Sequence, residues 1–209
     1  MTGLLFEDLK CVGIKALVKG KAQEFRAKEV ILSCGAIHSP AHLMRAGIGP
    51  AGHLRDLGIP VRHALFGVGQ RLMDHPSIAL AAFVKPHARV TNKETRRHLF
   101  IGLRYSSDMG GAPPGDMFVV GATKTSWHAV GEQIGTFILF VNKTFSETGQ
   151  VRLRSRSASD EPEVDFNLLS DRRDLERLAD GLKRLAPIYA DPVMQGAIAN
   201  PFPASYSDK

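Results

Sequence analysis

The chain has 209 residues, of which 44% are hydrophobic and 23% charged, a balance typical of a globular protein with one sizeable domain or one and a half. Its formal net charge of +6 is spread along the sequence without the basic stripe and interleaved aromatic residues that nucleic-acid binding needs, which argues against that class of partner. We find no basic leader and no apolar run long enough to span a bilayer, so we expect a cytoplasmic protein without a membrane span.

The first 26 residues predict a small antiparallel meander. Leu4–Phe6 and Val12–Leu17 are expected to form two strands, and a turn at residues 19–21 leads into a third near Glu24–Arg26. Cys11 and Cys34 both lie in apolar, strand-like segments, where a free cysteine behaves as a small hydrophobe. We therefore predict no disulfide bond.

The stretch Glu29–Pro50 predicts a strand, a tight glycine turn and a short helix. Val30–Leu32 is an apolar run typical of a strand buried on both faces, and the small residues Ser33–Ala36 let the backbone line the end of that strand. Ser39 is expected to cap a helix whose first turn holds Pro40. Such a turn presents backbone amides to a phosphate-bearing ligand in many α/β folds, but it also occurs as a simple packing turn, and the residues alone leave both interpretations open.

The segment that follows predicts a short helix, a strand and a glycine loop. Residues 53–57 form the helix, which Gly58 closes, and Val61–Leu65 forms the strand. In the loop, Asp74 is expected to cap its neighbour, and His75 is held in an extended conformation by the proline that follows it. On the residues alone this loop is as readily structural as functional.

Three patterns resemble functional motifs but are interpreted as coincidental. The string Gly47–Gly52 matches G-x-G-x-x-G, yet it follows a helix and contains a proline where a pyrophosphate would need an amide donor. His38 and His42 have a spacing that suits a metal, but no acidic residue or cysteine lies nearby, and His38 is expected to precede the helix. Trp127–His128 is expected to pack on a loop. We predict no metal site.

The second part of the chain predicts an antiparallel sheet, because several strands follow one another without helices between them. These strands are expected over residues 77–84, 99–103, 117–122 and 136–142. Residues 106–115 predict a flexible surface loop, and the strict alternation of residues 150–154 predicts a half-exposed strand.

A long helix closes the predicted fold. Asp171 is expected to cap it, and Pro187 to bend or end it near Ile188. Leucines are expected to form one buried stripe, and two ion pairs the opposite side. The stripe contains Leu175, Leu178, Leu182 and Leu185, and the pairs are Arg172–Glu176 and Asp180–Arg184. From Asn200 onward the sequence has no period and predicts a tail.

Three strings of the sequence resemble the glucose-methanol-choline (GMC) oxidoreductases, which are FAD-dependent alcohol oxidases and dehydrogenases. The first is GAIHSPAHLMRAGIGP over residues 35–50, in which Ala46 stands where the family usually has serine. The second is GVGQRLMDHP over residues 67–76, in which Arg71 replaces the usual asparagine. The third comprises residues 146–153 and 161–171, and all three follow the order of the family.

The resemblance implies an α+β fold in two parts. Residues 1–76 correspond to a partial FAD-binding domain made of the meander, the strand, the glycine turn and short helices. Residues 77–209 correspond to a substrate-binding domain, an antiparallel sheet with a flanking helix at about residues 171–190. The residues that the resemblance places at the cofactor are Gly35, Ala36, Ser39, Pro40, Asp74 and His75.

The resemblance also implies that the chain is an internal fragment of a choline dehydrogenase-like enzyme. The N-terminal FAD fingerprint and the late catalytic histidine of the family are not found in the sequence. We expect the parent to oxidise a small alcohol by hydride transfer to flavin, and the isolated chain to lack FAD, catalytic residues and activity. Faces left exposed could support a homodimer. A non-catalytic binding or interaction module stays open as an alternative, and a two-histidine metal hydrolase as a third interpretation.

Overall fold

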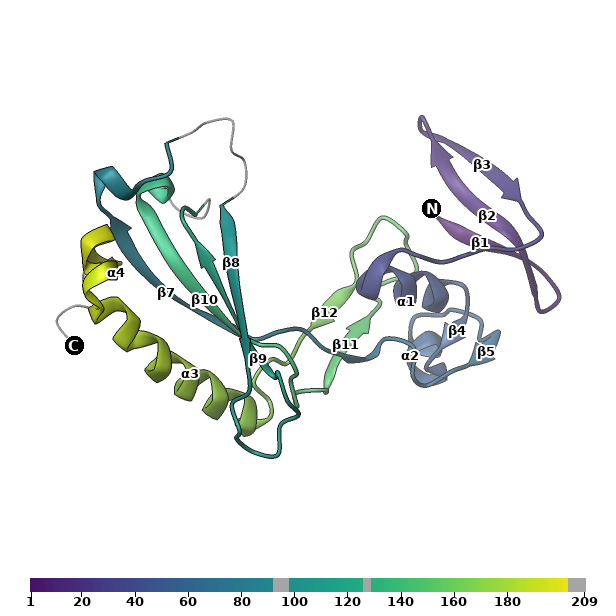
Figure 1. Ribbon diagram of the computed structural model, residues 1–209. Helices are drawn as coiled ribbons and strands as arrows, with labels where there is room; N and C mark the ends of the chain where they lie inside the picture. The colour runs from purple at the N-terminus through teal and green to yellow at the C-terminus, as the bar shows by residue number, and fades with distance from the viewer. Residues whose placement is uncertain (92–97, 126–128, 203–209) are drawn as a thin grey trace. The chain divides into compact units, whose positions relative to one another are not determined.

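The computed structural model describes residues 1–91, 98–125 and 129–202, so the predicted packing of Trp127–His128 lies outside the described residues. The chain divides into two compact units (Figure 1). Unit 1 consists of Met1–Met73 and Glu147–Asn167, and unit 2 of Asp74–Ser146 and Leu168–Lys209. The sequence grouped residues 147–167 with the second part of the chain, whereas in the structure they pack with the first.

Unit 1 begins with the predicted meander. Strands β1 (Gly3–Glu7), β2 (Lys10–Val18) and β3 (Lys21–Arg26) form one antiparallel sheet in the order β1-β2-β3. Gly13 lies in the middle strand, where an added Cβ would stand 2.2 Å from the carbonyl oxygen of Phe25. The glycine therefore allows β3 to approach β2 closely.

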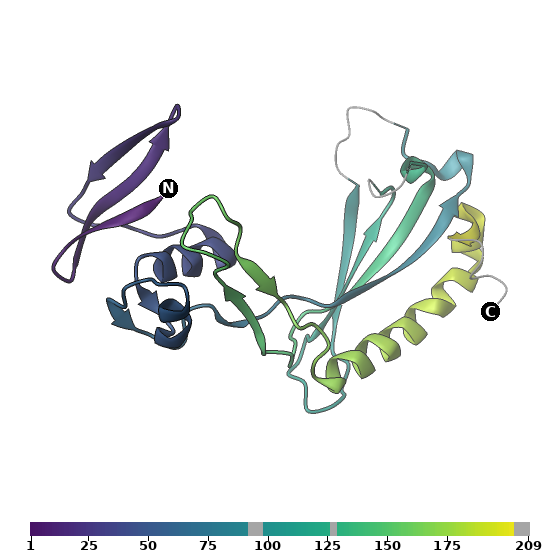
Figure 2. The same ribbon diagram turned by 180° about the vertical axis from the view of Figure 1, so that it is seen from behind.

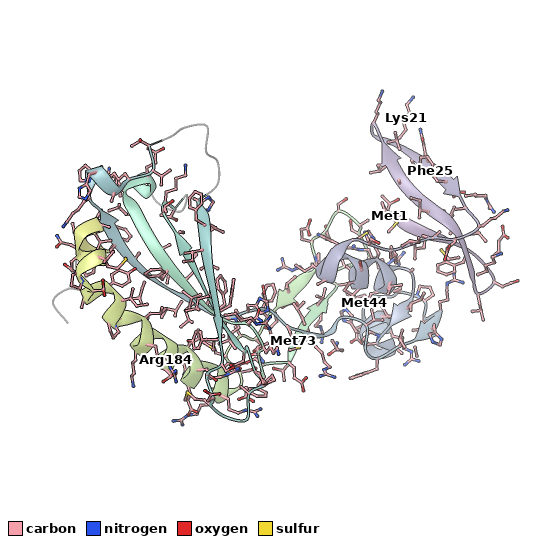
Figure 3. All side chains as sticks on the ribbon, in the orientation of Figure 1. Met1, Lys21, Phe25, Met44, Met73 and Arg184 are labelled. Atoms are coloured by element: carbon pink, nitrogen blue, oxygen red, sulfur yellow. The ribbon has the colours of Figure 1, made fainter. Side chains whose placement is uncertain are left out.

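The remainder of unit 1 packs small elements around a single hydrophobic core. The elements are α1 (Gly35–Arg45), β4 (Ile48–Gly49), α2 (Ala51–Asp56), β5 (His63–Ala64), β6 (Gln70–Leu72), β11 (Gly149–Arg152) and β12 (Glu163–Asp165). Strands β12, β11 and β6 form an antiparallel sheet, while β4 and β5 pair in parallel. Met44 of α1, labelled in Figure 3, is 1% exposed and shares the core with Leu54, Val68, Val151 and Leu153.

Unit 2 is a five-stranded antiparallel sheet with a long helix on one face (Figures 1 and 2). Its strand order is β13-β7-β10-β9-β8. The strands are β7 (Ser77–Val84), β8 (Leu99–Tyr105), β9 (Met117–Ala122), β10 (Ile134–Val141) and β13 (Ile198–Phe202), and the helices are η1 (Pro86–Ala88), η2 (Gly131–Gln133), α3 (Arg172–Ala190) and α4 (Pro192–Ala197). The predicted α+β class, with antiparallel sheets and a flanking helix, is confirmed.

Helix α3 begins where the sequence predicts, and two leucines of the predicted stripe, Leu178 and Leu185, are buried. The Asp171 carboxylate accepts a hydrogen bond from the amide of Arg173, and Leu178 and Leu185 pack against Leu139 and its neighbours in the sheet. Leu175 is 52% exposed, so its assignment to the buried stripe was wrong. Two polar residues of α3, Asp174 and Arg177, are buried instead.

Two further expectations about secondary structure were wrong. Val30–Leu32 is not a strand, and Ile31 is 78% exposed, because no described strand pairs with this segment. The predicted tail after Asn200 begins inside β13, which pairs with β7 through Pro201 and Phe202. An edge strand tolerates proline when the missing amide would face away from the neighbouring strand. This explains how a segment without the alternation of a typical strand can still form β13.

Candidate functional site

The amino end of α1 carries four of the predicted site residues. The helix begins at Gly35 rather than after Ser39, so Ser39 and Pro40 lie inside it and the predicted cap position was wrong. Ser39 instead turns back toward the start of the helix, where its Oγ accepts a hydrogen bond from the amide of Cys34 at 3.0 Å. Cys34 lies at the cap position and is exposed, whereas the sequence predicted that it lies in a strand. Cys34 and Cys11 are both free thiols.

Gly35 is conformationally required at this point. Its φ is +78°, in the left-handed region that other L-residues reach only with strain, and an added Cβ would meet nothing within 4 Å. The glycine is therefore needed for the direction of the chain and not for space. Its exposed position leaves room for a ligand beside the backbone.

The first turn of α1 favours electron-rich groups. The amides of the first turn of any helix have no acceptor within the helix, and they lie at the positive end of its dipole. The first turn of α1 holds no acidic side chain that would neutralise this end, and the Cys34 side chain makes no capping hydrogen bond. Burial and the nearby Arg45 guanidinium lower the pKa of His42 further along the helix, so this imidazole is neutral at physiological pH.

The other two predicted site residues, Asp74 and His75, open unit 2. Both are exposed, and Asp74 Oδ1 accepts a hydrogen bond from the amide of His75 at 2.7 Å, as the sequence predicted. Pro76 is buried, and its carbonyl accepts from the amide of Val141 at 3.0 Å, which fixes the entry into β7. The six predicted residues thus belong to two units, and a single site formed by all six stays a prediction.

Several residues of the family-like strings have a packing role that the sequence did not predict. Gly69 has φ +78°, and a Cβ there would lie 2.4 Å from the carbonyl oxygen of Val151. A Cβ at Gly149 would lie 2.3 Å from the carbonyl of Leu72. Both glycines let β11 approach the loop that carries the second string. Arg71 adopts φ +56° and pairs with Glu147.

Two of the three patterns that were set aside lie within the described residues, and their surroundings differ from those expected. Gly49 lies in β4 and α2 follows at Ala51, so the glycine string does stand between a strand and a helix. Gly47, however, ends α1 with φ +85° against the carbonyl of Pro60, and Pro50 occupies the cap position of α2. His38 lies within α1, not before it as expected. Within residues 1–91, 98–125 and 129–202, no group of three potential metal ligands is found.

Unit 2 contains a buried ionic cluster that the sequence did not predict. Arg177 Nη1 donates to Asp116 Oδ2 at 2.8 Å, its Nη2 contacts Asp174, and all three side chains are at most 1% exposed. Burial opposes ionisation of both aspartates, but hydrogen bonds outweigh it and keep both pKa values below the usual range. Asp116 accepts these hydrogen bonds from Arg177 and Ser107. Asp174 accepts them mainly from the Phe145 amide, Ser146 and Thr144. A helical pair at positions 174 and 177 could have been anticipated, but not its burial or its third member.

Comparisons with known proteins place these elements in one family. Two models described as GMC oxidoreductase match residues 2–77 and 145–209. The chain is 41% identical over 184 residues to a 5-(hydroxymethyl)furfural oxidase of Methylovorus sp., covering 86% of this chain and 33% of that protein. It is 33% identical over 202 residues to the choline oxidase of Arthrobacter globiformis, covering 91% and 36% respectively. The chain therefore spans about a third of the length of these relatives.

Solved structures share the fold at low sequence identity. A formate oxidase matches with a TM-score of 0.84 at 19% identity, over 96% of this chain and 44% of that one. Pyridoxine 4-oxidase from Mesorbium loti matches with a TM-score of 0.79 at 21% identity, over 96% and 40%. Among the described residues, no helix is both long and apolar enough to cross a membrane.

Proposed function

The chain belongs to the GMC oxidoreductase family, and from this premise we propose that it forms part of an FAD-dependent enzyme that oxidises a small alcohol. The observation that carries the proposal is that two models of this one family match the chain, in family order, over residues 2–77 and 145–209. The 41% identity to an oxidase of a hydroxymethyl compound supports the same reaction class. FAD is the cofactor that this membership implies for the parent protein.

The amino end of α1 fits one wall of a cofactor site. Gly35 holds the chain in a left-handed turn with open space beside it, and Ala36 follows on the exposed side of the helix. We assign their backbone amides to an electron-rich group of FAD, since no acidic side chain in the first turn opposes it. Ser39, through the Cys34 amide, and Pro40, through its fixed φ, keep this end of the helix in place.

Unit 2 fits the substrate side of the enzyme. Its sheet carries α3 on one face, while in the described part of the chain no helix crosses the other face (Figure 2). Strand alternation puts Phe118, Val120, Ile138 and Phe140 on that second face, all partly buried. We propose unit 2 as the substrate-binding domain and unit 1, with residues 147–167 packed into it, as part of the FAD-binding domain, and Asp74 and His75 lie where the chain first passes from one unit to the other.

The proposed reaction removes a hydride and a proton from the alcohol. Bound FAD would supply the oxidising power for removal of the hydride from the carbinol carbon, and the hydroxyl proton would have to pass to a base. Among the described residues, we assign no side chain to that role and expect the base to lie outside residues 1–209. The isolated chain should accordingly hold no FAD and show no turnover.

The two relatives named above support a proposal for the substrate class. One acts on 5-(hydroxymethyl)furfural and the other on choline, and both names describe compounds that carry a hydroxyl group. We propose a small molecule with an accessible alcohol. A neutral furan alcohol and a cationic alcohol differ in what a pocket must supply, because a quaternary ammonium group favours aromatic faces. The two compounds are therefore the first pair to compare.

The experiment is purification of the parent protein together with the 209-residue chain. The parent should be yellow, and anaerobic addition of 5-(hydroxymethyl)furfural or choline should bleach its flavin absorbance. The 209-residue chain should be colourless and should not bleach under the same treatment. A parent protein without flavin, or with flavin that no alcohol reduces, would falsify the proposed function.

A further inference from the structure

His53 of α2 takes the place of a backbone acceptor at the end of β11. In β11 the amide of Val151 donates to the carbonyl of Gly69 at 2.7 Å. Amides two positions apart in a strand point to the same side, so the amide of Leu153 would seek the next acceptor along that neighbour. β6 begins only at Gln70, and Nε2 of His53 accepts from the Leu153 amide instead, at 3.1 Å.

The amide of Leu153 depends on this imidazole because the surrounding residues are buried. Leu153 is 3% exposed and shares the core of unit 1 with Leu54, the residue that follows His53. A buried amide that loses its acceptor is left without a hydrogen bond, which is more costly than the loss of the same bond at the surface. His53 thus links two segments that are 100 positions apart in the sequence.

Two hydrogen-bond donors face this one imidazole. Besides the amide of Leu153, the guanidinium of Arg152 places its Nη2 at 3.2 Å from Nδ1 of His53. A neutral imidazole has a single acceptor nitrogen, and a protonated imidazole has none. Arg152 is exposed and can donate to water, whereas the buried amide cannot, so we assign the acceptor role to Nε2 and the proton to Nδ1.

The charges that act on His53 also favour its neutral form. Burial and the guanidinium of Arg152 lower the pKa of His53, while Asp56 of α2 and Glu163 of β12 act in the opposite direction. Two other elements, α1 and β6, line the pocket beside this imidazole with uncharged side chains, Met44 and Gln70. The net effect is a lowered pKa, so geometry and charge require the same protonation state.

The loop that follows β11 has a second attachment, which does not depend on His53. Nη2 of Arg45 in α1 donates to the carbonyl of Asp160 at 2.6 Å, and an arginine stays protonated at any physiological pH. Loss of the His53 contact would therefore free only the first end of the loop 153–162. Arg154 lies at that end and is exposed.

We propose that His53 is a pH-sensitive tie, which holds the start of the loop 153–162 to α2 while neutral and releases it when protonated. A proton taken up from solvent binds Nε2, which can then no longer accept from the Leu153 amide, and the new positive charge repels Arg152. Since histidine has an unfolded-state pKa of about 6.5, the tie contributes fully to stability above about pH 6.5. This contribution is lost as the pH falls from there through the lower pKa of the folded state.

An NMR titration of the 209-residue chain tests the tie directly. The amide proton of Leu153 should move upfield on acidification, as its hydrogen bond breaks, with the same midpoint as the ring protons of His53. That midpoint should lie below about 6.5. A Leu153 amide that does not follow the His53 titration overturns the proposal, and so does a midpoint at or above that value.

Two variants separate the acceptor from the charge. His53→Gln keeps a side-chain oxygen at about the reach of Nε2 but does not titrate, whereas His53→Leu offers no acceptor. At neutral pH, trypsin should cleave after Arg154 about threefold faster or more in H53L than in the wild-type chain, while H53Q should match the wild type within about twofold. The fall in Tm between about pH 7.5 and 5.5 should be smaller in H53Q than in the wild type.

The matched control is His63→Gln, which removes an exposed histidine of β5 in the same unit and should keep the wild-type dependence of Tm on pH. Equal cleavage of H53L and the wild type overturns the proposal, as does an H53Q variant whose Tm falls with pH as the wild type's does. The NMR titration needs no variant, so the test stands even if one fails to fold. None of these readouts depends on FAD or on turnover, so the inference can fail without the proposed function failing.

Discussion

Replacing Arg177 by methionine should destabilise unit 2 more than any other exchange of an arginine in α3. The guanidinium lies between Asp116 and Asp174 with no exposed side-chain surface, and Nη1 also donates to the carbonyl of Lys143 at 3.0 Å. Methionine has a similar length and can fill the volume. The exchange therefore removes the positive charge and its hydrogen bonds without leaving a large cavity.

The size of the effect depends on the hydrogen bonds that the two carboxylates keep when the guanidinium is removed. Removing one partner of a buried ion pair costs about 3–5 kcal/mol, because the remaining charge stays buried without compensation. Asp174 still accepts from the amides of Phe145 and Ser146, each at 2.9 Å, and Asp116 still accepts from the amide and hydroxyl of Ser107, at 2.8 and 2.7 Å. We therefore expect the lower limit, about 3 kcal/mol, and a fall in Tm of roughly 10 °C for a unit of this size.

Urea denaturation followed by circular dichroism measures this loss, and Arg172→Met is the matched control. Arg172 is 87% exposed and pairs with Glu176 one turn along the same helix, so its replacement should change the free energy of unfolding by less than about 0.5 kcal/mol. If R177M lost less than about 1 kcal/mol, or no more than R172M, the argument that buried carboxylates depend on this guanidinium would be refuted.

Four further predictions concern backbone strain and acid stability. Gly35→Ala should lower the free energy of unfolding by about 1–2 kcal/mol, because Gly35 has a φ of +78°. Gly52→Ala, inside α2 and with open space for a Cβ, should raise the free energy of unfolding by about 0.5–1 kcal/mol. Equal urea midpoints for the two variants would contradict this. Gly69→Ala combines a positive φ with a Cβ 2.4 Å from Val151 O and should cost about 3 kcal/mol in the same assay. Arg71 has φ +56°, and Arg71→Asn should be more stable than Arg71→Ala by about 0.5–1 kcal/mol. Both variants lose the ion pair with Glu147, but asparagine tolerates the left-handed region better than alanine does. An alanine variant of equal or greater stability would count against this reasoning. Hydrogen bonds from Arg173 lower the pKa of Asp171 to about 2, so the ionised Asp171 stabilises the folded state above the unfolded-state pKa of about 4, and this contribution is lost as the pH falls toward 2. Asp171→Asn should therefore flatten the plot of Tm against pH between about 4 and 2. A variant whose Tm depends on pH as the wild type does would argue against this assignment.

Elements whose signals are local were predictable from the sequence. The meander depends on turns and alternation within 26 residues, and its three strands formed where expected. Strand β9 was predicted with its observed bounds, and the cap at Asp171 and the pairs Arg172–Glu176 and Asp180–Arg184 were also correct. Each of these features is decided by residues that lie close together in the sequence, which is the range over which patterns in a single sequence carry information.

Features that depend on distant partners were not predictable. The burial of Asp174 and Arg177 requires Asp116, which is 61 positions from Arg177, and only the fold brings them together. Leu175 was expected in the core on helical periodicity, but the sheet meets α3 at Leu178, Gly181 and Leu185, and Leu175 is left 52% exposed. β11 joins β6 from about 80 residues away, so the role of Gly69 as a close contact to Val151 became visible only in the structure.

The same distinction explains the outcome at the candidate cofactor site. The composition of Val30–Leu32 favours a buried strand, yet a strand needs hydrogen-bonding neighbours, and no described strand pairs with this segment. Helix α1 keeps its position without that strand, because Ala41 and Met44 anchor it in the core of unit 1 and Ser39 holds its start. The exposed turn at Gly35 is thus supported from one side only. Its position comes from the core contacts of α1 and from Ser39, and not from the buried strand that the sequence predicted.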